Sequence, residues 1–90
     1  MSGRFDELVG QTVVVDIDGP VIYIGRLAAI GPDALTLEEV DIHNLGDSGT
    51  GREKYIIEAR KLGVRPNRRR AEVRLARVVG VSRLEDVIEF

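Results

Sequence analysis

LVGQTVVVDIDGPVIYIGRLAAIGPDALTLEEV, residues 8–40, contains three apolar runs separated by turn residues. The runs are Gln11 to Ile17, Val21 to Ile30 and Ala34 to Val40. Their Val, Ile and Leu residues favour pleated strands. The separators, Asp18-Gly19-Pro20 and Gly31-Pro32-Asp33, have the composition of tight turns. This stretch therefore predicts three consecutive antiparallel strands.

Gly25 lies in the middle of the second predicted strand. A glycine inside a strand pattern weakens the strand unless the sheet bends sharply or another backbone comes close. A bent middle strand makes the sheet curl. We therefore predict an all-β fold in which these strands begin a small barrel.

A short helix is expected before the strands, because Ser2 to Val9 combines a capping residue, early acids and one apolar face. Gly10 follows as a C-terminal cap. The third strand is short in this reading, although residues 41–45 can extend it. A glycine-rich loop, residues 46–51, comes next.

The segment from Arg52 to Leu62 has apolar residues at helical spacing, and Gly63 follows. We predict an inserted helix here, with Thr50 and Glu53 as a capping box. The alternative is a long strand through residues 55–57. In either case an insert spans about residues 41–67, between the third and fourth strands.

The last part of the sheet is predicted over residues 70–81, because Ala71, Val73 and Leu75 alternate with charged residues as in a half-buried strand. The alternation changes phase at Ala76-Arg77, which indicates a bend between a fourth and a fifth strand. The tail, residues 82–90, is compatible with a helix behind Ser82 or with further strand.

Ninety residues with 43% hydrophobic content predict one folded domain, residues 1–90. No window is apolar enough to span a membrane, and the first residues lack the pattern of an export signal. The absence of cysteine fits a cytoplasmic location. A single histidine excludes a zinc site of the usual Cys/His type.

The charges are distributed unevenly along the chain. Residues 52–83 hold eleven basic and three acidic residues, whereas the remainder holds two basic and twelve acidic residues. The densest cluster consists of Arg65, Arg68, Arg69, Arg70, Arg74 and Arg77. Such a cluster suits a polyanion or an oppositely charged patch of another copy.

No constellation of catalytic residues is evident. Gly46-Asp47-Ser48-Gly49 matches the tetrapeptide around a serine-protease nucleophile, but the scaffold that such chemistry needs is missing. The glycine spacing at 46–51 resembles a phosphate-binding loop, but Arg52-Glu53 replaces the required Lys-Ser/Thr pair. We therefore expect no enzyme activity, no cofactor, no metal and no small-molecule substrate.

Five strands with bends, behind a short N-terminal helix, describe a small SH3-like barrel. The residues also resemble the Sm/LSm family. The first motif of that family is similar to Gly10, Val13, Val15, Ile17, Asp18-Gly19, Gly25, Leu27, Leu35, Leu37 and Glu39. The second is similar to residues 73–81, VRLARVVGV, in which Arg74 matches the family's Arg and Leu75 replaces its Gly.

The resemblance implies a cyclic homo-oligomer closed by strand pairing between neighbours, with single-stranded RNA at its central pore. The base-gripping Asp and Asn of the family fall on Gly31 and Ala34, with Asp33 beside them. The expected nucleic-acid contacts are Arg74, Arg77, Arg68, Arg69, Arg70 and Asp33. The alternative is a self-assembling scaffold, or a protein-interaction module, without nucleic acid.

Overall fold

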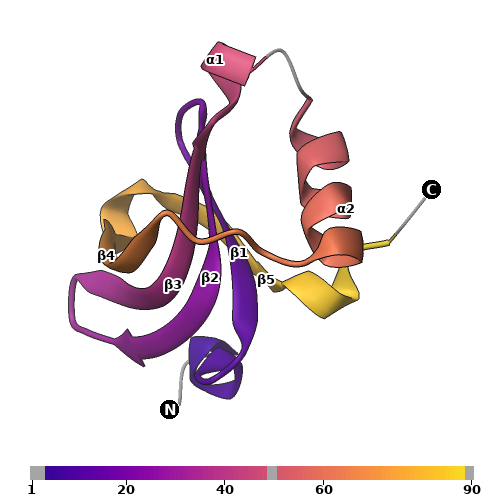
Figure 1. The fold of residues 1–90 in the computed structure, drawn as a ribbon. Coiled ribbons are helices and arrows are strands. Elements are labelled where there is room, and N and C mark those ends of the chain that lie inside the picture. The colour runs from indigo at the N-terminus through magenta and orange to yellow at the C-terminus, as the bar shows by residue number, and fades with distance from the viewer. Residues whose placement is uncertain (1–3, 49–50, 89–90) are drawn as a thin grey trace.

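The computed structural model describes residues 4–48 and 51–88, in which five antiparallel strands form one curled sheet (Figure 1). The strand order is β4-β3-β2-β1-β5. The strands are β1 (Thr12–Ile17), β2 (Val21–Ile30), β3 (Ala34–Asn44), β4 (Arg68–Arg74) and β5 (Val78–Arg83). The expected mostly-β fold with a barrel-like curl is confirmed.

The bend predicted at Gly25 is present, and its cause is a close approach of two backbones. A Cβ atom at Gly25 would lie 3.1 Å from the Glu38 carbonyl oxygen and 3.1 Å from the Val40 Cα. The pairing of β2 with β3 shifts register at this point, and Glu39 there has a φ of 51°. Such bulges increase twist and bend the strands. They allow β2 and β3 to curve around the core.

The interior of the curled sheet holds the main core. Its fully buried side chains are Val13, Val15, Leu27, Leu35, Leu37 and Val40, with Val73 nearly so. They come from four strands at alternating positions, as a half-buried sheet requires. Leu8 packs against this core from the 3₁₀ helix η1 (Arg4–Leu8), as expected of a short N-terminal helix. Gly10 follows with a φ of 91°.

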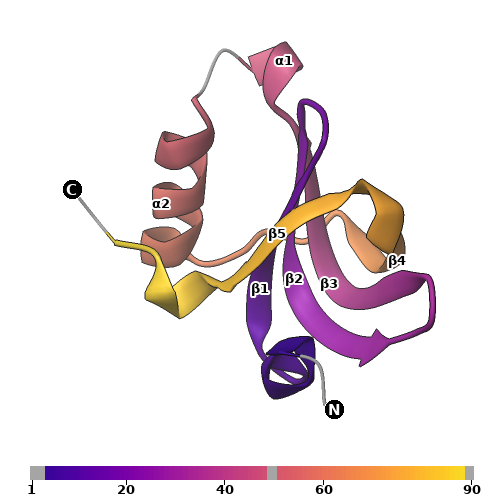
Figure 2. The same ribbon diagram turned by 180° about the vertical axis from the view of Figure 1, so that it is seen from behind.

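A second core lies on the outer face of the sheet, under helix α2 (Arg52–Leu62). Ile56 and Ala59 of α2 cover Val14, Ile22 and Ile24 of β1 and β2. The helix stands beside the strands on the side opposite β4 in both views (Figures 1 and 2). The prediction of a helix over 52–62 is therefore confirmed, and the alternative of a long strand is wrong.

The predicted insert is shorter than residues 41–67. Strand β3 continues to Asn44, so the insert begins with the short helix α1 (Leu45–Ser48). Gly51 is the N-cap of α2 and has no side-chain hydrogen bond, and the predicted capping box depends on Thr50. Thr50, and Ser2 of the first predicted helix, lie outside the described residues.

The phase change at Ala76-Arg77 is a 3₁₀ turn, η2 (Leu75–Arg77), which joins β4 to β5. The tail begins as the last part of β5 and continues as another 3₁₀ turn, η3 (Leu84–Asp86). Each alternative for the tail is therefore met in part: residues 82 and 83 are strand, and a three-residue 3₁₀ helix follows. No helix among the described residues, 4–48 and 51–88, is long and apolar enough to cross a membrane.

Candidate nucleic-acid interface

Strand β4 places its arginines at the edge of the sheet. Ala71 and Val73 point inward, which leaves Glu72 and three arginines, Arg68, Arg70 and Arg74, on the outward face. These three side chains and Arg69 are exposed. On the described chain β4 pairs with β3 alone, so its second edge is open. The predicted Arg68-Arg69-Arg70 cluster is thus a solvent-facing basic strand.

Arg74 lies beside the loop between β2 and β3. It is the register partner of Ala34, and the Leu75 amide donates a hydrogen bond of 2.9 Å to the Asp33 carbonyl oxygen. Asp33 and Arg74 are both exposed. The structure therefore brings together two of the predicted contact residues, one anionic and one cationic, at one corner of the barrel.

Arg77 does not join this corner. Its guanidinium forms an ion pair with the Asp18 carboxylate, in the turn between β1 and β2. The Asp18 amide also donates a hydrogen bond of 3.1 Å to the Arg77 carbonyl oxygen. The hydrogen bond and the charge of Asp18 raise the pKa of the Arg77 guanidinium. Arg77 thus ties η2 to the first turn, and its positive charge is locally neutralised.

The arginines of β4 lack such partners. Glu38 lies across from Arg70 in the register, but its carboxylate pairs with Arg26 instead. Among the described residues, Arg69, Arg70 and Arg74 form no side-chain ion pair or hydrogen bond, whereas Arg68 donates to the Asn67 carbonyl oxygen. About 13 Å separate Arg70 from Arg74 along the extended strand. On the outward face of β4, Arg70 and Arg74 are therefore two separable basic positions without partners.

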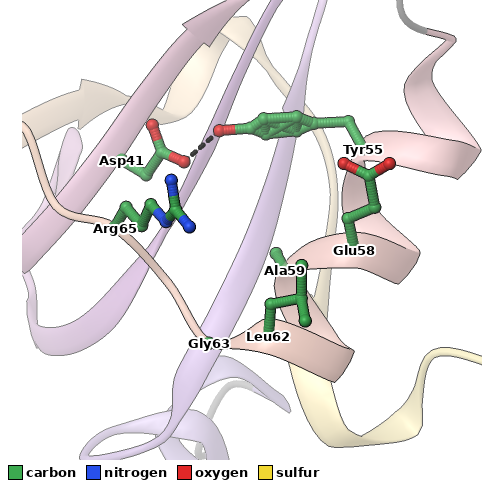
Figure 3. A pocket seen from close by; sticks show the side chains of 7 residues that line it. All are labelled: Asp41, Tyr55, Glu58, Ala59, Leu62, Gly63 and Arg65. Carbon is green, nitrogen blue, oxygen red and sulfur yellow. Dashed lines mark hydrogen bonds between the residues drawn. The ribbon is translucent and has the colours of Figure 1, made fainter.

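A hollow of about 260 Å³, lined by both apolar and charged residues, lies elsewhere, between α2 and β3 (Figure 3). The Tyr55 hydroxyl donates a hydrogen bond to Asp41, and His43 stacks on the Tyr55 ring at 3.9 Å. Burial and this hydrogen bond raise the pKa of the Tyr55 phenol above its ordinary value. Arg65 and Glu58 point into the same hollow (Figure 3).

The contacts in this hollow were not foreseen from the sequence. The only signal was the alternation that puts Asp41 and His43 on the outer face of an extended third strand. Asn67 closes the arrangement, because its side chain accepts from the Ile42 amide at 3.1 Å and donates to the Ile42 carbonyl at 2.9 Å. These contacts hold α2 and the returning chain against β3. We interpret them as structural.

No protein-family model matches the sequence, and no curated protein gives a significant match. A chain in the crystal structure of the NatC complex bound to CoA is similar in fold, with a TM-score of 0.56 and 16% sequence identity. The alignment covers 90% of this chain and 84% of that chain. The two chains are therefore of similar length and share a fold.

Proposed function

We propose that this chain is an Sm-like module that forms a cyclic homo-oligomer through its sheet edges and binds single-stranded RNA beside Asp33 and Arg74. The main support for this proposal is the strand order, which leaves both β4 and β5 with one open edge on the described chain. Open edges present unpaired backbone groups to another chain. The similar chain in the NatC structure also belongs to a protein complex, which supports a role within an assembly.

The RNA-binding proposal is supported by the arrangement at the corner of β4. Arg74 has no ion-pair partner among the described side chains, so its guanidinium is available for a phosphate or for stacking on a base. Asp33 supplies a nearby carboxylate that can accept hydrogen bonds from base amino groups. Asp33 and Arg74 are also among the residues for which the resemblance to the Sm/LSm family implies RNA contacts.

Fluorescence anisotropy of a labelled, unstructured U-rich RNA tests this proposal at low and near-physiological salt. We expect binding at both salts, and we expect Arg74→Ala to weaken it at least about tenfold, because a phosphate or stacking contact is lost. Arg77→Ala is the matched control, since Asp18 already neutralises Arg77. Equal loss in both variants, or equal binding of heparin, would refute a specific RNA site at this corner.

A scaffold without RNA is the second candidate, and two observations favour it. Arg52, Arg77 and Arg83 of the basic segment are engaged in ion pairs within the chain. The rings of His43 and Tyr55 stack on each other between α2 and β3, away from β4. Single-strand binders usually stack bases on exposed aromatic rings. Homo-oligomers in sedimentation analysis without any RNA binding would select the scaffold.

A further inference from the structure

A second hollow, of about 290 Å³, lies between α2 and β5 on the outer face of the sheet. We call it the α2–β5 hollow; its lining residues are Val14, Asp16, Glu53, Ile56, Ser82, Val87 and Ile88. Val14 and Ile56 are buried, whereas Ile88 is 73% exposed. The hollow thus combines an apolar floor with two carboxylates.

The two carboxylates of the α2–β5 hollow are not equivalent. Asp16 forms an ion pair with Arg52, at the start of α2. Glu53 is exposed and has no ion pair or hydrogen bond with the described side chains. Glu53 therefore leaves the hollow with one uncompensated negative charge. A long side chain with an aliphatic stem and a cationic head has the chemistry to fill such a place.

The hollow borders the open edge of β5. Ser82 is the register partner of Val14, and both lie on the outer face. A strand added to that edge continues the sheet, and its alternate side chains project over the same face. Its outward side chains at the end of β5 therefore reach the hollow.

Strand β4 carries side chains that match this hollow in charge and length. Its outward face carries exposed arginines, and its own second edge is open. Antiparallel addition brings the first half of β4 to the end of β5, where Ser82 lies. Of the outward arginines in that half, Arg68 already donates to Asn67 of its own chain, whereas Arg70 has no partner there.

We propose that the α2–β5 hollow receives Arg70 from β4 of a second copy, with the guanidinium against Glu53 and the stem over Val87 and Ile88. This inference rests on the proposed assembly and assigns one of its contacts to α2. The inserted helix then selects the partner strand by charge, in addition to covering the outer core. Charge pairs at an interface fix register and exclude wrong partners.

Charge reversal tests the contact by sedimentation velocity across a range of protein concentrations. Glu53→Arg and Arg70→Glu should each weaken assembly roughly fivefold to tenfold, because each places like charges together. The double variant should return to within about twofold of the unmodified chain. A mixture of the two single variants should also reassemble, because each seam between unlike copies then joins opposite charges.

Two matched controls accompany these variants. Glu58→Arg alters the same helix on the side facing the other hollow, and Lys61→Glu reverses an exposed positive charge in the last turn of that helix, outside β4 and outside the lining of the α2–β5 hollow. Both should leave assembly unchanged. If Glu53→Arg assembles normally, or if neither the double variant nor the mixture recovers, the contact is refuted while the ring stands. If the unmodified chain is monomeric at all concentrations, the proposed assembly fails as well.

Discussion

Replacing Gly25 by alanine tests whether close backbone packing shapes this barrel. The added methyl group would lie 3.1 Å from the Glu38 carbonyl oxygen, 3.1 Å from the Val40 Cα and 3.2 Å from the Val40 Cγ2. Comfortable contacts between carbon atoms are about 3.5–4.0 Å. Two of the three atoms belong to the backbone of β3, so no side-chain rotation relieves the contact. The strands must separate where β3 is bulged.

The change in the free energy of unfolding caused by Gly25→Ala is the difference between two opposing effects. Overpacking a well-filled interior costs about 1–3 kcal/mol. Alanine also restricts the unfolded chain, which returns about 0.4–1 kcal/mol. Because two of the contacts are with backbone atoms, the cost of overpacking exceeds the return, and we expect Gly25→Ala to lower the free energy of unfolding by about 1–2 kcal/mol. In a domain of this size that change lowers the Tm by about 4–16 °C.

Urea unfolding followed by circular dichroism measures the effect, at a fixed protein concentration because the proposed assembly would add to apparent stability. Gly19→Ala is the matched control: a Cβ atom at Gly19 meets nothing within 4 Å, and the residue has no positive φ. Its stability should stay within about 0.5 kcal/mol or rise slightly. If Gly25→Ala is as stable as Gly19→Ala, the contact with β3 does not control the bend.

Two further predictions concern the attachment of α2. Tyr55→Phe removes the hydrogen bond to buried Asp41 and should cost about 1–2 kcal/mol in urea unfolding. Because folding raises the pKa of Tyr55 above 10.0, its contribution is complete below that pH and is lost at higher pH. Raising the pH above 10 should therefore lower the free energy of unfolding less in this variant than in the unmodified chain. An equal decrease in both proteins would contradict a role for the Tyr55 hydroxyl. Asn67→Ala should speed hydrogen exchange of the Ile42 amide about tenfold, and unchanged exchange would refute its role.

The strands and α2 could be predicted because their signals are local. Val21–Ile30 and Arg52–Leu62 begin and end at the predicted residues, since turn residues or Gly63 mark their limits. The sequence leaves the end of the third strand open between Val40 and residue 45, and in the structure β3 ends at Asn44. Glu39 adopts a positive φ at the bulge, and the alternation resumes in a new phase from Val40 to Asn44. A bulge formed against Gly25 has no signal within β3 itself.

The candidate site was predicted less completely, because its contacts join residues far apart in sequence. Six residues were expected to act together, yet only Asp33 and Arg74 meet at one corner. Arg77 does not take part in this corner because its guanidinium pairs with Asp18, which lies 59 residues earlier in the first turn. No periodicity encodes such a pair. The position of Glu53 beside β5 likewise depends on how α2 docks onto the outer face.

The two proposed uses of β4 do not compete for the same side chain. Arg70 lies at the half of β4 that antiparallel pairing brings to the α2–β5 hollow, and Arg74 lies beside Asp33 at the other end. Ring formation can therefore use one arginine while the other stays open to RNA. Screening by salt weakens both contacts, but strand pairing and apolar contact persist in salt. We therefore expect the assembly to survive high salt under conditions in which RNA binding is lost.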